Sequence, residues 1–155
     1  MSLPSVRAFL SVHAPDLSVL ETSTRMATVA EAAEALGVAP GQIAKTLSLW
    51  LKEEVVLLVL GGDAKIDNRK FKDQFKTKAK MLNADEVVEW TSHPVGGVCP
   101  FGLPRELKIF ADITLKKFDV VLSAAGCATA ALRFAPGRLT QLVQAEWVDV
   151  TQAQG

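Results

Sequence analysis

The feature that most constrains the fold of this chain is an unbroken apolar run, VVLLVL, at residues 55–60. A strand with one face in water alternates apolar and polar residues, so a run with almost no alternation indicates a strand at the centre of a sheet. The run is far shorter than the roughly 20 residues that a membrane-spanning helix needs. A second β-compatible run at 43–51 precedes it, and the polar residues 52–54 separate the two. This spacing predicts two adjacent antiparallel strands.

One helix is marked at both ends. Thr28 and Glu31 form a T-x-x-E capping box, and Gly37 supplies a left-handed C-terminal stop. The alanine-rich sequence between them has high helix propensity, so we predict a helix over residues 29–36. The other predicted helices, two of them behind the caps Asp67 and Asn83, span residues 4–13, 67–75, 83–90 and 138–143.

The order of the remaining strands favours an α/β or α+β fold. We predict a single domain whose mixed, largely antiparallel sheet is flanked by helices, because strands follow one another in hairpin-like order without strict β-α alternation. No G-x-G-x-x-G sequence follows a strand and no P-loop is present, which disfavours a dinucleotide-binding or NTP-binding fold. The remaining predicted strands span residues 18–22, 107–112, 118–124, 128–134 and 146–150.

The composition indicates one globular domain across residues 1–155. Hydrophobic residues make up 49% of the chain, which excludes disorder, and a chain of this length buries roughly two thirds of its extended surface. No apolar stretch predicts a membrane span, and the N-terminal sequence, interrupted by Arg7, lacks the pattern of a signal peptide. We therefore expect a cytoplasmic protein with no membrane association.

The two cysteines, Cys99 and Cys127, are too few for a disulfide framework and have no CxxC partner or histidine cluster. We expect free thiols, no bound metal and no cofactor. An alternative makes Cys99 a nucleophile with His93 as its base, because both lie in one loop. No third residue that would orient the histidine is identifiable, and most free cysteines are small buried hydrophobes.

A basic stretch runs from Lys65 to Lys80, with seven basic and two acidic residues in a chain whose net charge is zero. Lysines contact backbone phosphate without reading sequence, so the stretch would suit a structured RNA. The alternative is a solvated helix face. The candidate phosphate contacts are Lys65, Arg69, Lys70, Lys72 and Lys76.

The loop at residues 93–102 contains three glycines and two prolines. Glycines let a backbone approach a ligand closely and prolines stiffen the loop, so it could form an anion or carbonyl cradle, although a rigid turn without function is the alternative. Lys45 is the one charge in the apolar run 43–51. It points either to solvent or into a pocket, where it would be a lone cation awaiting an anion.

Several segments resemble, in order and spacing, the YbaK/prolyl-tRNA-synthetase-associated family of aminoacyl-tRNA editing domains. The resemblance runs from about residue 22 to residue 142. Its most specific parts are the helix-Leu-Gly-Val stretch that leads to Lys-Thr-Leu and the G-x-x-x-P loop, Gly96 to Pro100. The segments are TVAEAAEALGVAPGQIAKTL, LGGDAKID, VGGVCPFG, IFAD and SAAG.

The resemblance implies a pocket between the strand that carries Lys45 and the glycine-proline loop. Carried over by position, the implied catalytic residues are Lys45, Gly96, Gly97 and Pro100. We also expect His93, at the start of that loop, to contact substrate. The other implied substrate-binding residues are Gly61, Gly62, Asp63, Asp112 and Gly126.

The activity that the resemblance implies is hydrolysis of the ester between a wrong amino acid and its tRNA. The amino acid would be small, the carrier tRNA-Pro or a related tRNA, and the partners a mischarged tRNA and an aminoacyl-tRNA synthetase. An aminoacyl ester is already activated, so the protein would hold it, place a water and stabilise the oxyanion. The terminal ribose hydroxyl would help to activate the water, and Lys45 would bind the terminal nucleotide or its phosphate. A non-catalytic tRNA- or nucleotide-binding module is the alternative.

Overall fold

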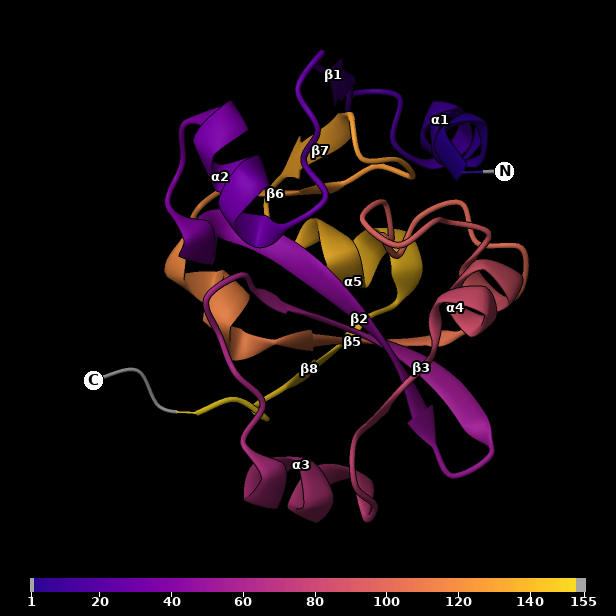
Figure 1. Ribbon diagram of the computed structural model, residues 1–155, viewed down its shortest axis with the longest axis vertical. Coiled ribbons are helices and arrows are strands. Elements are labelled where there is room, and N and C mark those ends of the chain that lie inside the picture. The colour runs from indigo at the N-terminus through magenta and orange to yellow at the C-terminus, as the bar shows by residue number, and fades with distance from the viewer. Residues whose placement is uncertain (1, 153–155) are drawn as a thin grey trace.

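Strand β3 (Glu54–Gly61) lies at the centre of the sheet, as its unbroken apolar sequence predicts. The structure is a computed structural model that describes residues 2–152 (Figure 1). β3 pairs antiparallel with β2 (Ile43–Leu51) on one side and parallel with β5 (Lys108–Asp112) on the other. The predicted antiparallel pair of strands at residues 43–61 is therefore confirmed.

Within the described residues, eight strands form one sheet in the order β1-β7-β6-β2-β3-β5-β8, with β4 paired to β2. The pairs β1–β7, β6–β7, β2–β3 and β2–β4 are antiparallel, and β2–β6, β3–β5 and β5–β8 are parallel. This pairing confirms the predicted mixed, largely antiparallel sheet. The remaining strands are β1 (Val19–Glu21), β4 (Lys80–Met81), β6 (Val121–Ala124), β7 (Ala130–Phe134) and β8 (Glu146–Val148).

The predicted helix caps are present. The Thr28 hydroxyl accepts a hydrogen bond from the Glu31 backbone N–H at 3.1 Å, and Gly37 ends the helix with a φ of 68°. Among the described residues, no helix has the length and apolar sequence to cross a membrane. The helices are α1 (Ser2–His13), α2 (Val29–Leu36), α3 (Asn68–Phe75), α4 (Ala84–Thr91) and α5 (Arg138–Val143), with short 3-10 helices η1 (Pro40–Gln42) and η2 (Ile113–Lys117).

Alternate residues of β3 face two separate hydrophobic cores. Leu57 and Val59 belong to the larger core, to which α1 and α5 contribute. Leu58 and Leu60 face the second core, which Phe71 of α3 closes. Figure 1 shows α3 at the bottom of the view, away from α1 at the top. Because both faces are covered, every residue of the apolar run is at most 2% exposed, and each buried side chain contributes about 1.5–3 kcal/mol.

Three short elements, η1, β4 and η2, were not predicted from the sequence. β4 contains only Lys80 and Met81, too few residues to show a periodic pattern. η2 begins where the Asp112 side chain accepts a hydrogen bond from the Thr114 backbone N–H, which turns the chain directly after β5. The strand predicted at residues 118–124 consequently starts only at Val121.

The buried Asp112 carboxylate joins the end of β5 to two other segments. Its oxygens accept hydrogen bonds from the Thr114 backbone N–H and hydroxyl at 3.0 and 2.7 Å, from the Val150 N–H at 2.9 Å and from the Thr151 hydroxyl at 2.9 Å. The Thr114 hydroxyl in turn accepts from the Gly61 N–H at 3.0 Å. Asp112 was predicted to bind substrate, but the structure places it in this internal network with no exposed surface.

We expect Asp112→Asn to lower the free energy of unfolding by about 2–4 kcal/mol. Hydrogen bonds to a charged group contribute roughly 1.5–3 kcal/mol, and the amide NH₂ of asparagine would have to face one or more of the donors. Urea unfolding measures the change, and Asp119→Asn, at an exposed aspartate, is the matched control. A loss below about 0.5 kcal/mol would show that the network does not hold the fold.

Candidate functional site

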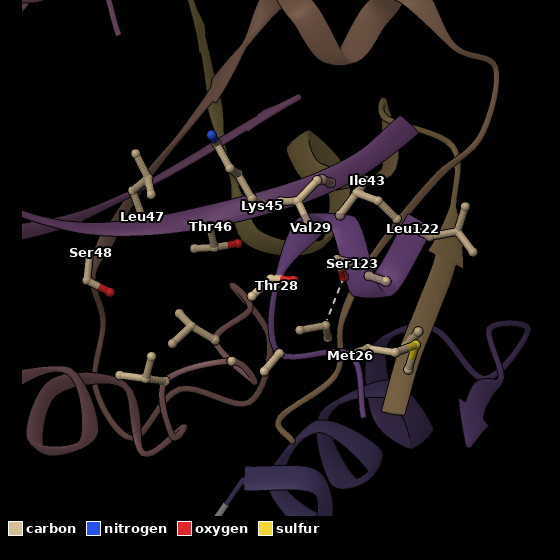
Figure 2. A pocket seen from close by; sticks show the side chains of 18 of the residues that line it. Met26, Thr28, Val29, Ile43, Lys45, Thr46, Leu47, Ser48, Leu122 and Ser123 are labelled. Atoms are coloured by element: carbon tan, nitrogen blue, oxygen red, sulfur yellow. Dashed lines mark hydrogen bonds between the residues drawn. The ribbon is translucent and has the colours of Figure 1, made fainter. Parts of the chain in front are cut away.

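A cavity of about 330 Å³ lies beside β2, between the start of α2, the end of β6 and the glycine-rich loop 93–102. Figure 2 shows side chains from these elements gathered on one side of β2. The wall is largely apolar and includes Met26, Val29, Leu82, Val98 and Leu122. Among the described residues that line it there is no histidine, cysteine, aspartate or glutamate. The cavity therefore holds no acid or base except Lys45 at its edge.

The cavity lies where one edge of β2 has no neighbouring strand. On this edge β6 pairs with Ile43 and Ala44, and β4 pairs with Leu49 and Trp50, so the described register leaves residues 45–48 paired only with β3. We call this stretch the β2 gap. The Ser48 carbonyl faces the gap side, because it accepts a hydrogen bond from the Leu82 N–H at 3.1 Å.

Backbone direction alternates along an antiparallel strand, so the Thr46 N–H and carbonyl also face the gap. A ligand in the cavity can therefore hydrogen-bond to the main chain of β2. This main-chain edge adds donors and acceptors to a wall whose side chains are mostly apolar.

Lys45 leaves β2 on the opposite side from the cavity body. Figure 2 shows Lys45 and Leu47 on one side of the strand and Thr46 and Ser48 on the other. The half-buried Lys45 ammonium donates a hydrogen bond to the Ala64 carbonyl at 3.0 Å. Burial lowers the pKa of Lys45, and the negative charge of Asp63 opposes this effect. Lys45 thus borders the β2 gap with a cation, but the ammonium does not project into the cavity beside Thr46.

The glycines of the loop serve close packing more than exposed donors. A Cβ on Gly97 would lie 2.6 Å from the Cys127 backbone, and the Gly97 carbonyl accepts from the Gly126 N–H at 2.9 Å. The Gly97 N–H donates to the Pro94 carbonyl at 2.9 Å, so it is already used inside the loop. Gly96, with a φ of 93°, packs on Ala27 and lines the cavity. Gly96 is therefore the loop glycine that can approach a ligand.

The residues of the predicted Gly-Gly-Asp motif do not line the cavity but pack against η1, next to β2. A Cβ on Gly62 would lie 2.3 Å from the Pro40 carbonyl oxygen, so only glycine lets the end of β3 pack against η1. The Asp63 carboxylate lies over Gly41, where a Cβ would be 3.0 Å from Oδ1. Of the ten predicted catalytic and substrate-binding residues, Lys45 and Gly96 line the described cavity, and the other eight do not: Gly61, Gly62, Asp63, His93, Gly97, Pro100, Asp112 and Gly126.

His93 and Cys99 form a buried contact inside the loop. The His93 Nε2 lies 2.8 Å from the Phe101 carbonyl oxygen and 3.7 Å from the Cys99 sulfur, and neither side chain is exposed. Burial raises the pKa of the Cys99 thiol to about 12 and lowers the pKa of His93. A neutral imidazole that donates to a carbonyl beside a neutral thiol is a structural pair, which argues against the nucleophile alternative.

We expect Cys99 to resist alkylation in the folded protein. At pH 8 a thiol with a pKa of about 12 is ionised to roughly one part in 10⁴, and no reagent reaches it directly. Iodoacetamide should therefore modify a Cys99→Ala variant at the half-buried Cys127, but should modify a Cys127→Ala variant only after unfolding. Rapid modification of folded Cys127→Ala protein would restore Cys99 as a candidate nucleophile.

Two cavity residues were missed by the sequence analysis. Thr46 and Ser48 flank Leu47 on one face of β2, and both hydroxyl oxygens are buried without a hydrogen-bond partner among the described atoms. The sequence contains a signal for them, because two hydroxyl residues two positions apart in an apolar strand share one face of the strand.

The basic stretch lies on and around α3. Lys65, Arg69, Lys72 and Lys76 are exposed, whereas Lys70 donates to Asp149 Oδ1 at 3.1 Å and to the Thr151 carbonyl at 2.9 Å. α3 covers the sheet face onto which Leu47 and Leu60 project, and strand alternation places Lys45 on the same face. The basic residues and the cavity therefore lie on opposite faces of the sheet, with the β2 gap at the edge between them.

Comparisons with known proteins agree with this geometry. The model of the aminoacyl-tRNA editing domain family matches residues 24–142. An uncharacterized protein of Bacillus subtilis (strain 168), YwhH, is 42% identical over 152 residues, which cover 97% of each chain. A proline–tRNA ligase of Kosmotoga olearia is 37% identical over 90 residues, which are 57% of this chain and only 16% of the ligase. A crystal structure described as "a putative trans-editing enzyme for prolyl tRNA synthetase" superposes with a TM-score of 0.89 at 28% identity, covering 97% of both chains.

The chain belongs to the family of aminoacyl-tRNA editing domains. The predicted YbaK-like resemblance and the predicted fold class are thereby confirmed. The matched region contains β2, β3, the loop 93–102 and the first turn of α2, so it includes every element around the cavity.

Proposed function

We propose that this protein is a trans-acting aminoacyl-tRNA deacylase, which hydrolyses the ester of a small amino acid mischarged onto tRNA-Pro or a related tRNA. One observation carries the proposal: this member of the family has a cavity of about 330 Å³ beside the β2 gap, and the described residues that line it include no histidine, cysteine, aspartate or glutamate. Such a site can bind and position an activated ester for attack by water. Family membership and the match to the described trans-editing enzyme support the cytoplasmic, tRNA-directed role.

The proposed reaction needs no side-chain nucleophile. The oxygen of a bound water attacks the ester carbonyl carbon, and the terminal ribose oxygen leaves with a proton, releasing amino acid and tRNA. The ribose hydroxyl next to the ester would help to take the proton from the water. Main-chain N–H groups, from the β2 gap and from Gly96, are the candidates for stabilising the oxyanion. One such donor typically accelerates a reaction by roughly 10²–10³-fold.

Lys45 is suited to bind the nucleotide end of the substrate. An ammonium carries three donors, and the hydrogen bond to the Ala64 carbonyl uses one of them. Because Lys45 stands on the α3 side of the β2 gap, a phosphate there would be close to the cation while the aminoacyl group enters the cavity. The exposed basic residues of α3 would then contact the acceptor arm on the same face.

The decisive experiment measures deacylation of a panel of mischarged tRNAs carrying alanine, serine, threonine or cysteine. A deacylase releases free amino acid faster than buffer does, with turnover beyond one equivalent. A recruiting module binds the tRNA without accelerating release. Absence of turnover on every ester, with tRNA binding intact, would leave the non-catalytic alternative. Adding prolyl-tRNA synthetase to the same assay tests whether that enzyme acts as a partner.

We expect Lys45→Met to reduce kcat/KM for intact mischarged tRNA by about 30-fold or more, since methionine keeps an apolar stem but removes the charge. An aminoacyl-adenosine without phosphate should lose less than about threefold, because it cannot use the cation. Thermal unfolding verifies that the variant is folded. Turnover of intact tRNA equal to that of the unsubstituted protein would remove Lys45 from the mechanism.

The basic residues of α3 should control the salt dependence of tRNA affinity. Each lost phosphate contact reduces the slope of log affinity against log salt by about 0.7–0.9. We therefore expect Arg69→Gln/Lys72→Gln to reduce the slope by about 1.5. The control Lys52→Gln/Lys108→Gln removes the same charge at the β2–β3 turn and the start of β5 and should leave the slope unchanged. Equal salt slopes for both double variants would show that the basic stretch is a solvated helix face and does not contact tRNA.

A further inference from the structure

Two buried hydroxyls in the cavity lack hydrogen-bond partners. Thr46 Oγ1 and Ser48 Oγ are both inaccessible to solvent, and neither finds a donor or acceptor among the described atoms. Figure 2 shows both hydroxyls on the side of β2 that faces the cavity. Burying a hydroxyl without a partner costs free energy, so this arrangement is unfavourable in the empty protein. A ligand that supplies the missing partner would remove the cost.

The surroundings of these hydroxyls limit what the partner can be. Ser48 is only 4% exposed and has apolar neighbours in the same wall, including Leu82 and Val87. No charged side chain lines the cavity apart from Lys45, whose ammonium lies on the other side of β2. A charged amino-acid side chain would be desolvated there without a counter-charge, which is strongly unfavourable. A small neutral group that can both donate and accept a hydrogen bond fits this environment.

We propose that the cavity selects aminoacyl esters whose side chain bears a hydroxyl, that is, serine and threonine. This inference rests on the proposed deacylase function and names its substrate class. Rotation of the two side chains about χ1 would bring Thr46 Oγ1 and Ser48 Oγ from their buried positions to the cavity surface. The substrate hydroxyl would then hydrogen-bond with them, because each can donate and accept. The methyl group of threonine would contact the apolar wall.

The shared parts of every aminoacyl ester have other partners. The ester carbonyl and the α-amino group can use the main-chain donors and acceptors at the β2 gap. The hydroxyls instead belong to side chains that project from the strand into the cavity. A purely apolar pocket discriminates between a substrate that bears a hydroxyl and its isostere by a kcat/KM ratio of only about 10² at best. A pocket with hydrogen-bonding groups for the hydroxyl can reach a ratio of about 10⁴ or more. Thr46 and Ser48 are therefore the candidate specificity-determining residues.

The test compares kcat/KM for the same tRNA charged with serine, threonine, alanine or cysteine. We expect the unsubstituted protein to prefer the serine and threonine esters over alanine by at least about 30-fold. Thr46→Val is nearly isosteric, and Ser48→Ala removes only one oxygen; each should reduce serine and threonine hydrolysis by about tenfold or more while alanine hydrolysis changes by less than about threefold. In the control Ser123→Ala, whose hydroxyl donates to the Ala124 carbonyl, the serine-to-alanine ratio should persist.

The outcomes separate this inference from the proposed function. Hydrolysis of alanine or cysteine esters as fast as serine esters would overturn the inference and leave the deacylase function standing. An equal loss on all four esters in Thr46→Val and Ser48→Ala would also overturn it, because the hydroxyls would then hold the shared part of the substrate. No hydrolysis of any ester would overturn the function and the inference together.

A stability measurement provides a readout that is independent of activity. If the two hydroxyls await a ligand, Thr46→Val should unfold at a temperature equal to or above that of the unsubstituted protein, because valine needs no partner. The control Thr151→Val removes the hydroxyl of a buried threonine that donates to Asp112 at 2.9 Å, and it should unfold at a lower temperature. A marked destabilisation by Thr46→Val would show that its hydroxyl already has a structural partner, which would overturn the inference.

Discussion

The Asp112 carboxylate accepts four hydrogen bonds from segments that lie far apart in the sequence, and the position of the candidate site follows from it. Through Thr114 it holds the N–H of Gly61 at the end of β3. The next residue, Gly62, packs closely on both η1 and α2, because a Cβ there would lie 2.3 Å from the Pro40 carbonyl oxygen and 2.6 Å from Val29 Cγ1. The Asp112 side chain, which does not line the cavity, is thus linked through Thr114 and Gly61 to the glycine that packs against α2, a helix whose residues do line the cavity.

The edge of β2 separates a basic surface from a largely apolar cavity. On the α3 face lie the basic residues and the Lys45 ammonium, which suit an anionic nucleic-acid backbone. On the other face lies a largely apolar cavity with two unpartnered hydroxyls, which suits a small uncharged group. The proposed substrate, an aminoacyl-tRNA, has an anionic part and a small neutral part within a few bonds of each other, so each part would meet the matching side of this edge.

Local patterns predicted most of the fold, because each depends on neighbouring residues. The apolar run of β3 and the capping box at Thr28 are examples, and both appear as expected. The site was less predictable, because side-chain direction and packing distance depend on tertiary structure. Sequence motifs marked Lys45 and the loop glycines, but could not show that Lys45 points away from the cavity or that the Gly97 N–H is used by Pro94. The two hydroxyls at Thr46 and Ser48 became candidate ligand contacts only when the structure showed that they are buried without hydrogen-bond partners among the described atoms.

The β2 gap also bears on the addition of strands from other molecules. Unpaired strand edges are templates on which strands of other molecules add, and long ones promote aggregation. Here the stretch that lacks a neighbouring strand on one side is confined to residues 45–48 between β6 and β4, whereas a typical strand has five to six residues. A foreign strand would collide with β6 or β4 before it could form a stable ladder. The gap is therefore too short to be a good template for another strand, whereas the proposed small ligand needs only a few of the same hydrogen-bonding groups.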